Sequence, residues 1–526
     1  MLIGLLPLLA PAALLISAAV ALSAPPQSLH TTARLSEGLA LMALAVGLGA
    51  LVIVATQGPL ASPLIGLAGI GLSVRLDAVS VAMLLLVGFV GWVVLRYSTT
   101  YLRLEAKQNA FRGLISLTLA AVMFLVLAGN VVQLVLAWIA TSLFLHRLLL
   151  FYPERLAAQR AARKKFVTAR LGDVAVAGAA VLLSIAYGTT DIGTMLSAAR
   201  AGDGGTFAHV AAALLAIAAL LKSAQFPTHG WLTEVMETPT PVSALLHAGV
   251  INAGGFLLIR FADVMLLSPG VLALLVFVGG FTALFGGLVM LTQPAVKTSL
   301  AWSTVAQMGF MILQCGLALF PLALLHIVAH SLYKAHAFLA AGGAVDTIAA
   351  NRRPGPVAVP RVKAVGRAFL LALGIYLVSG LAFGLDHKSP QAIALGAILI
   401  FGVAYMLAQG LADAAPRALT RRTITYALAT SISYFALQNI ADWLTAGVLP
   451  PVPAPGPLEW ALIVLAVVTF GLVAVIQAMF PLWAYHPAAA GLRVHLSNGF
   501  YANAIFDRAL KGWRIPVPTP SKKQGA

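Results

Sequence analysis

Residues 207–227 read FAHVAAALLAIAALLKSAQFP and decide the class of fold to which this chain belongs. The run carries no formal charge before Lys222 and ends in Pro227. An uncharged apolar stretch of about 20 residues is long enough to cross a bilayer as one helix. The lysine and the proline near its end predict a membrane helix that is interrupted at this point.

The rest of the 526-residue chain repeats this apolar character, with 60% hydrophobic and 9% charged residues. Its mean hydropathy of +0.96 is far from that of a soluble protein. We therefore expect an all-α polytopic membrane protein with about 15 transmembrane helices. The expected spans are approximately 2–22, 36–56, 78–95, 113–129, 131–151, 167–187, 207–225, 240–262, 268–292, 298–317, 320–344, 368–385, 390–411, 424–441 and 458–480.

The net charge of +17 does not indicate nucleic-acid binding, because the basic residues lie in short loops without interleaved aromatic residues. Of the 33 Lys and Arg residues, 28 fall in loops and ends that follow odd-numbered spans. Such segregation predicts a bacterial inner-membrane protein with a periplasmic N-terminus. The membrane domain is expected over 1–483 and a cytoplasmic tail over 484–526.

The sequence also lacks the common signatures of catalysis. Cys315 is the single cysteine, so neither a disulfide framework nor a cysteine-ligated iron–sulfur cluster can form within this chain. Neither GxxxxGK[ST] nor GxGxxG occurs, which leaves ATP hydrolysis and hydride transfer without a visible site. We therefore expect a transport subunit rather than an enzyme.

A second interruption is predicted at 380–390, where Asp386, His387 and Lys388 break an apolar run. Paired interruptions in two halves of a chain are typical of transporters built from inverted repeats, here over about 112–411. Two ordinary helix ends are the alternative interpretation.

Lys222 is the first candidate for an ion-pathway residue. Burial favours the neutral form of a lysine and a nearby carboxylate favours the charged form, so a movable ion pair can load and release a proton. The alternative is a lysine at a helix end whose ammonium reaches the membrane surface.

His326, His330 and Lys334 are spaced at i, i+4 and i+8, which predicts one shared helix face. Imidazoles stacked one turn apart and followed by a lysine make a plausible proton relay, and His247 extends the same polar line. Core histidines with satisfied hydrogen bonds are the alternative. A metal site is disfavoured, because this face offers no carboxylate or cysteine.

Three acidic residues are candidate partners of Lys222. Asp173 lies three residues after Arg170, a spacing that also permits a local ion pair. Glu234 and Glu237 lie in a short polar segment close in sequence to the predicted interruption.

Four stretches carry a resemblance to a known family. The stretches 166–174 (FVTARLGDV), 221–249 (LKSAQFPTHGWLTEVMETPTPVSALLHAG), 296–311 (VKTSLAWSTVAQMGFM) and 326–343 (HIVAHSLYKAHAFLAAGG) occur in family order. They resemble the proton-translocating, antiporter-like subunits of respiratory complex I and of multisubunit cation antiporters.

This resemblance implies roles for the candidate residues. Lys222 falls on the family's broken-helix lysine and His247 on its following histidine. The central relay of the family falls on His326, His330 and Lys334, and its sixth-helix pair on Arg170 and Asp173. Lys388 aligns loosely with the family's terminal lysine.

Two features indicate which member of the family this chain resembles: one departure from the complex I pattern and one characteristic stretch. Complex I subunits carry Trp-Glu in the fifth helix, where this chain has Trp138-Ile139. With that carboxylate missing, we expect Glu237 to serve as the counter-ion of Lys222. The stretch at 229–264, HGWLTEVMETPTPVSALLHAGVINAGGFLLIRFADV, includes Asn252 and resembles the membrane subunits of DAB inorganic carbon accumulation complexes.

That resemblance implies an ion-conducting subunit that carries H+ or Na+ and holds no cofactor. It also implies a cytoplasmic zinc partner, DabA-like and similar to a β-carbonic anhydrase, that hydrates CO2 to bicarbonate. A cation/proton antiporter subunit and a proton-pumping complex I subunit are the alternatives.

Overall fold

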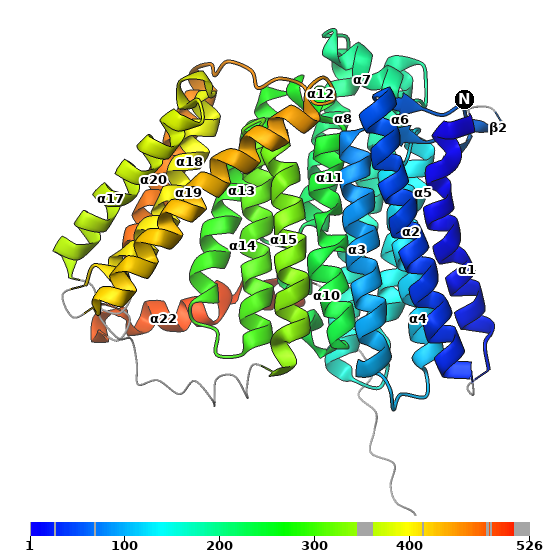
Figure 1. The fold of residues 1–526 in the computed structure, drawn as a ribbon, viewed down its shortest axis with the longest axis horizontal. Coiled ribbons are helices and arrows are strands. Elements are labelled where there is room, and N and C mark those ends of the chain that lie inside the picture. Colours follow the sequence, from blue (N-terminus) through cyan, green and yellow to red (C-terminus); the bar gives the residue numbers. More distant parts are fainter. Residues whose placement is uncertain are drawn as a thin grey trace, which may run out of the picture.

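The computed structural model describes residues 2–25, 28–67, 70–343, 361–412, 415–479, 483 and 486–509, and of Leu2 and Glu237 only the backbone. Long helices run side by side in alternating directions and form an elongated bundle, with α22 lying across one end (Figure 1). Thirteen helical segments of the described chain are long and apolar enough to cross a membrane. The prediction of an all-α polytopic membrane protein is confirmed.

The first part of the bundle contains η1 (Leu2–Leu8), α1 (Leu9–Ser23), α2 (Leu29–Gln57), α3 (Ala78–Tyr101), α4 (Gln108–Val126), α5 (Val131–Leu149), α6 (Leu156–Tyr187) and α7 (Ile192–Arg200). Two small antiparallel pairs connect α2 to α3, with β1 (Leu60–Ala61) beside β4 (Arg75–Leu76) and β2 (Ile65–Leu67) beside β3 (Ile70–Leu72).

The central part contains α8 (Gly205–Lys222), α9 (Gly230–Glu234), η3 (Val235–Glu237), α10 (Thr240–Ala248), η4 (Val250–Asn252), α11 (Ala253–Arg260), α12 (Ala262–Leu266), α13 (Pro269–Met290), α14 (Val296–Gly316), α15 (Phe320–Ala340) and η5 (Ala341–Gly343). The last part contains α17 (Val362–Ala382), η6 (Leu385–His387), α18 (Pro390–Gly410), α19 (Arg417–Thr445), α20 (Pro457–Ala478), η7 (Pro487–Ala489), α22 (Ala490–Ser497), η8 (Gly499–Tyr501) and α23 (Ala502–Ala509).

Each of the fifteen expected spans coincides with a long helix or with a helix built from consecutive pieces. Two of them, α14 and α19, are not among the thirteen segments that are both long and apolar enough to cross a membrane. Both are nevertheless long, since α14 has 21 residues and α19 has 29. They run within the bundle, with α14 along α13 and α15 and with α19 against α15, α17 and α18.

Glycine sets the close contact between α13 and α14, the most extensive helix pair of the bundle. A Cβ atom added at Gly309 would lie 2.5 Å from the backbone nitrogen of Ala283, and one added at Gly279 would lie 2.6 Å from that of Leu313. Membrane helices gain little from apolar burial against apolar lipid, so small residues that allow close backbone packing stabilise their association.

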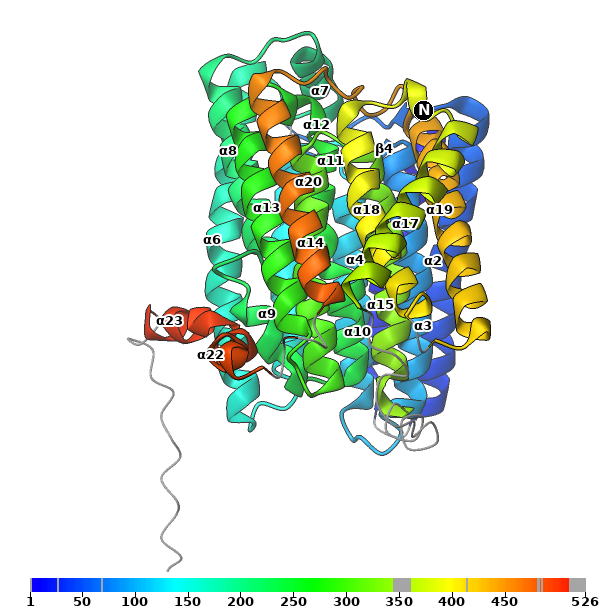
Figure 2. The same ribbon diagram turned by 90° about the vertical axis from the view of Figure 1, so that its left-hand side faces the viewer.

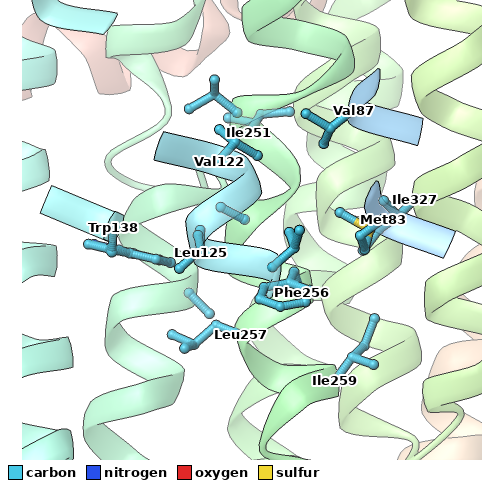
Figure 3. Close-up of a cluster of buried hydrophobic side chains, with 14 of the residues drawn as sticks. Met83, Val87, Val122, Leu125, Trp138, Ile251, Phe256, Leu257, Ile259 and Ile327 are labelled. Atoms are coloured by element: carbon cyan, nitrogen blue, oxygen red, sulfur yellow. The ribbon is translucent and has the colours of Figure 1, made fainter. Parts of the chain in front are cut away.

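The largest apolar core lies where α3, α4, α5, α11 and α15 meet (Figure 3). Met83, Leu125, Phe256 and Ile327 are among its buried side chains. Trp138 of α5 belongs to the same core and is 1% exposed. This core therefore fixes the position of the Trp138 ring within the bundle.

The second predicted interruption differs from the first. Residues 383–389 contain the short η6 turn and join α17 to α18, two helices that pack along each other. The turn lies at the end of the bundle that also holds α7 and the N-terminus (Figures 1 and 2). Its polar residues thus lie at a helix end, whereas α8 is interrupted inside the bundle.

Candidate functional site

The interruption of α8 is supported by side chains of neighbouring helices. After Lys222 the chain leaves the helix, and the Ser223 hydroxyl donates a hydrogen bond of 3.1 Å to the carbonyl oxygen of Ile251. The backbone N–H of Phe226 donates to the hydroxyl of Thr282, also at 3.1 Å. Backbone groups within a bilayer need partners inside the protein, and these contacts stabilise the irregular turn.

Lys222 lies at this interruption with its ammonium group enclosed by protein. Its side-chain Nζ lies 4.4 Å from the centroid of the Trp138 ring, a cation–π contact. Among the residues that the structure describes, Nζ has no hydrogen-bond partner. The alternative of a lysine that reaches the membrane surface does not fit, because Lys222 is only 9% exposed.

Asp173 is the carboxylate beside Lys222. It is the one acidic residue on α5, α6 and α8, which are described over their whole lengths, and it interacts electrostatically with Lys222. It also forms the predicted ion pair with Arg170, with 2.6 Å between Nη2 and Oδ2. Arg170 and Lys222 therefore share this carboxylate with Lys165, which also interacts with it electrostatically.

The two other candidate counter-ions have different positions. Glu234 accepts a hydrogen bond of 2.5 Å from the ammonium of Lys164 and also contacts the Asn503 amide, so the proposal that it pairs with Lys222 is corrected. Lys164 reaches Asp507 of α23 at 2.5 Å as well, which ties the C-terminal helix to α6. The side chain of Glu237 lies outside the described residues.

Lys165 is a buried cation that the sequence analysis missed. It is 4% exposed, and its ammonium donates to the carbonyl oxygen of Ser142 at 2.6 Å and to the Ser142 hydroxyl at 2.8 Å. It interacts electrostatically with Lys222 and Asp173. The signal in the sequence was weak, because Lys165 stands in a run of basic residues that looks like a solvated helix start.

The predicted face of α15 is confirmed. The ring centroids of His326 and His330 are 6.0 Å apart, and both His330 and Lys334 are buried. The Lys334 ammonium donates a hydrogen bond of 3.0 Å to the carbonyl oxygen of Leu300 on α14. The three residues therefore follow one another along the face of α15 that meets α14, and we call them the α15 stack.

His247 joins this stack from α10. Its Nδ1 lies 3.0 Å from the hydroxyl of Thr304, and its ring stacks on Phe338 of α15 with 4.4 Å between centroids. It interacts electrostatically with Lys334. His247 thus lies between the helix that follows the interruption and the stack on α15.

A polar contact connects the interruption of α8 to α15. Ile251, whose carbonyl accepts from Ser223, is followed by Asn252, and the Asn252 amide donates to the hydroxyl of Ser331 at 2.8 Å. Ser331 follows His330 directly in α15. Through η4, this contact connects the Lys222 site to the stack on α15 that contains Lys334.

The buried polar side chains that lead from the interruption of α8 to α15 are called the line below; they are Lys222, Gln225, His247, Asn252, His326, His330 and Lys334. Several of their polar atoms have no hydrogen-bond partner among the described residues. They are Lys222 Nζ, Gln225 Oε1, His247 Nε2, Asn252 Oδ1, His326 Nε2 and both ring nitrogens of His330. Buried polar groups are usually paired, so such a concentration marks this line as unusual. Lys222, His247, His326 and His330 are the titratable members of this set, and each can gain or lose a proton at the named atom without breaking a hydrogen bond there.

Lys388 lies apart from this line. Its ammonium donates to the Asn439 amide oxygen at 2.6 Å and to the Asp442 carboxylate at 3.0 Å. Both groups line an open pocket of about 640 Å³ at the end of the bundle that holds η6. The structure therefore does not bring Lys388 together with the other candidates.

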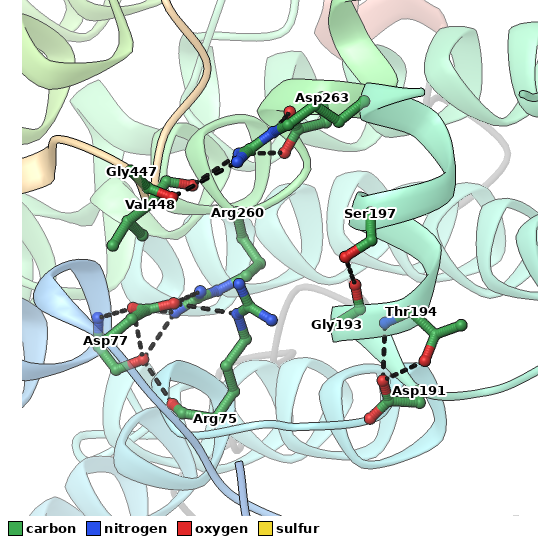
Figure 4. A network of polar contacts seen from close by, with 12 residues as sticks. Arg75, Asp77, Asp191, Gly193, Thr194, Ser197, Arg260, Asp263, Gly447 and Val448 are labelled. Atoms are coloured by element: carbon green, nitrogen blue, oxygen red, sulfur yellow. Dashed lines mark hydrogen bonds and ion pairs between the residues drawn. The ribbon is translucent and has the colours of Figure 1, made fainter. Parts of the chain in front are cut away.

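A second cluster of buried charges lies at this same end of the bundle (Figure 4). Arg260 of α11 contacts Asp77 at 2.6 Å and the Ser80 hydroxyl at 2.7 Å, and Arg75 contacts Asp77 at 3.0 Å. Burial opposes the ionisation of Asp77, but the charge and hydrogen bond of Arg260 outweigh it and lower the pKa to about 2. We name Arg75, Asp77, Ser80 and Arg260 the charge lock.

Metal binding has no visible site here: within the described ranges, no group of three or more His, Cys, Asp or Glu residues lies close enough together to hold a metal ion.

Comparisons with known proteins identify the family of this chain. Residues 128–353 match the family model described as the NADH:quinone oxidoreductase/Mrp antiporter transmembrane region, and residues 65–112 match that of the N-terminus of complex I chain 5. The first match contains the interruption of α8, His247 and the α15 stack.

Among relatives, the chain is 38% identical over 472 residues to a probable inorganic carbon transporter subunit, DabB2, of Halothiobacillus neapolitanus, covering 88% of this chain and 84% of the relative. It is 44% identical over 322 residues to a probable inorganic carbon transporter subunit, DabB, of Hydrogenovibrio crunogenus, covering 60% and 61%.

Among solved structures, a chain of the Mrp complex from a Dietzia species superimposes with a TM-score of 0.62 at 25% identity. The match covers 96% of this chain and 59% of the Mrp chain. The chain therefore belongs to the antiporter-like family of membrane subunits and, within it, to the DabB-type inorganic carbon transporter subunits.

Proposed function

We propose that this chain conducts protons through the membrane and thereby energises inorganic carbon accumulation by a cytoplasmic partner. The observation that carries the proposal is Lys222, a buried lysine at an interrupted helix. Among the described residues its ammonium has no hydrogen-bond partner, and Asp173 is the one carboxylate that interacts with it electrostatically. A buried lysine changes its protonation state readily when its surroundings change.

The residues of the line have complementary tasks in this proposal. Lys222 takes up a proton, and Asp173 stabilises the ammonium that forms. The proton passes through the polar contacts of His247 and Ser331 to the α15 stack. There His330 and Lys334 carry it further, since neither faces a fixed carboxylate on α10, α14 or α15, which are described in full and contain no acidic residue.

The partner in this proposal is a DabA-like zinc subunit similar to a β-carbonic anhydrase. The names of the relatives, which describe subunits of inorganic carbon transporters, support a complex of this kind. The partner would hydrate CO2 to bicarbonate, and proton flow through this chain would make the hydration one-directional. We place it at the end of the bundle where α5 ends and α6 begins, because the basic residues gather there.

A cation/proton antiporter subunit is the second candidate, and the likeness to a chain of an Mrp complex favours it. Na+ would then bind at backbone carbonyls of the interrupted helix. The two candidates differ in their dependence on Na+ and on a cytoplasmic partner.

The proposal is tested by growth in air of a carbonic-anhydrase-deficient host that expresses this chain together with the zinc subunit. We expect growth that requires both chains and that a protonophore abolishes. Lys222→Ala should abolish growth while both chains still co-purify. Unimpaired growth with Lys222→Ala, or growth that follows Na+ and not the proton gradient, would overturn it.

The orientation is tested separately by cysteine labelling. A cysteine introduced near Arg163 should react with an impermeant maleimide in inverted vesicles but not in intact cells. Labelling in intact cells would place the partner-binding end outside and contradict the proposal.

A further inference from the structure

One face of α5 carries three side chains that lead from the end of the bundle to Lys222. Trp138, Ser142 and His146 are spaced by four residues, so they lie on one face with a rise of about 6 Å between neighbours. Trp138 belongs to the buried core and His146 lies in the last turn of the helix. The face therefore runs from the middle of the bundle to the end where α6 begins.

Each of these three side chains faces a titratable group or its neighbour. The Trp138 ring faces the ammonium of Lys222, and Ser142 accepts two hydrogen bonds from Lys165. The His146 ring lies 5.2 Å from that of Phe166, the residue after Lys165, and interacts electrostatically with Lys165. The order from the end inward is thus His146, Lys165 and Lys222.

The charges of this region do not balance when both lysines are protonated. Lys165, Lys222 and Arg170 then carry three positive charges, and Asp173 carries the single negative charge available on α5, α6 and α8. Lys165 and Lys222 also interact with each other. Two like charges that are buried together disfavour each other, so protonation of one lysine promotes release from the other.

We propose that Lys165 is a second proton carrier, which loads Lys222 from the end of the bundle where α6 begins. In this step the ammonium of Lys165 loses one proton and becomes an amine, while the amine of Lys222 gains that proton and becomes an ammonium. Asp173 lies about two turns after Lys165 along α6. It passes the proton on or stabilises it in transit. His146 supplies the next proton to Lys165. This inference rests on the proposed function.

The adjacent Lys164 provides a matched control, since it is equally buried but is engaged elsewhere. Its ammonium contacts Glu234 of α9 and Asp507 of α23 at 2.5 Å each. The groups that face Lys165 are different: His146 from α5, Lys222 from α8, and Arg170 and Asp173 from α6. Lys164 and Lys165 thus separate a structural tie from the proposed carrier.

The test compares Lys165→Met, Lys165→Arg and Lys165→His with Lys164→Met in the complete two-subunit complex, by the rate of labelled bicarbonate accumulation between pH 6 and pH 9. We expect Lys165→Met and Lys165→Arg to be slower by tenfold or more, because neither side chain exchanges a proton. Lys165→His should retain part of the rate with its pH profile displaced to lower pH, because an imidazole titrates near 6.5. Lys164→Met should keep the wild-type pH profile.

The outcomes distinguish this inference from the proposed function. Full activity of Lys165→Arg, or an unshifted pH profile of Lys165→His, would show that Lys165 only anchors α6 to Ser142, provided that Lys222→Ala is inactive. Full activity of Lys222→Ala would instead overturn the proposed function. The amount of complex and its unfolding temperature, measured for every variant, separate loss of folding from loss of transport; a folded, inactive Lys165→Met supports the inference.

Discussion

The charge lock and the line from Lys222 to Lys334 are both buried and polar, yet they differ in how their groups are paired. Asp77 accepts hydrogen bonds from Arg260, Arg75 and Ser80, and its acceptor capacity is well used. Along the line, Lys222 Nζ and both ring nitrogens of His330 have no partner in the described chain. Of the buried side-chain atoms of the charge lock, Arg260 Nε alone has no hydrogen-bond partner among the described residues, so the lock is largely paired. A largely paired network holds helices in place, whereas an unpaired titratable group can gain or lose a proton without breaking a hydrogen bond. Breaking each region should therefore have a different consequence.

The largest effect on stability is expected from Asp77→Asn. Removal of the carboxylate leaves Arg260, whose side chain is 2% exposed, with an uncompensated buried charge. Such changes cost about 3–5 kcal/mol. Unfolding of the purified protein should start at a clearly lower temperature, while the protein that remains folded transports normally. A stable Asp77→Asn protein without transport would place the charge lock on the ion path.

The same variant should change the pH dependence of stability. The pKa of Asp77 is lowered from 3.8 to about 2, so its contribution is complete above its ordinary value and is lost as the pH falls toward 2. The wild-type protein should lose stability in this window more steeply than Asp77→Asn. Equal slopes for both proteins would contradict this assignment.

Lys334→Met should have the opposite pattern. Transport should fall by about 100-fold, because the carrier at the end of the α15 stack is gone. The unfolding temperature should stay the same or rise, since a buried cation without a carboxylate is removed. Lys334→Arg should be equally inactive, because an arginine keeps its proton. A destabilised protein with normal transport would make Lys334 a structural residue like those of the charge lock.

Asp173→Asn should reduce transport by about tenfold, because the charged form of Lys222 loses its nearest carboxylate. Glu234→Gln is the matched control, since Glu234 is held by Lys164 and lies away from Lys222. We expect this control to transport within about twofold of the wild type. Similar losses in both variants would show that the two carboxylates act together and that the position of Asp173 is not decisive.

The smallest effect is expected for Glu237. Glu237→Gln should impair carbon uptake a few-fold, on the order of 1 kcal/mol, and Glu237→Asp should be milder. We expect Glu237→Gln to be milder than Asp173→Asn, because Asp173 already lies beside Lys222. If Glu237→Gln were more harmful than Asp173→Asn, Glu237 would replace the missing fifth-helix carboxylate at Ile139, as the sequence suggested.

Much of the line could be predicted because it depends on local geometry. His326, His330 and Lys334 share a face in any α-helix, whatever packs against it. Lys222 stands out because a charge and a proline end a long apolar run. Lys164 and Lys165, by contrast, are neighbours with the same chemistry, and only the packing of α5, α9 and α23 decides that one ties α6 to the C-terminal helix while the other enters the interior.

The sequence by itself determined that the chain is a bundle of membrane helices, because runs of about 20 apolar residues have no other stable arrangement in a bilayer. It also determined which helices carry titratable groups. Only the tertiary structure decided which of those groups are partners: Asp173 and not Glu234 lies near Lys222, and Asp77 is paired with Arg260, which lies 183 residues away in the chain. The physical reason is that an ion pair depends on distances between helices, which helical periodicity does not contain.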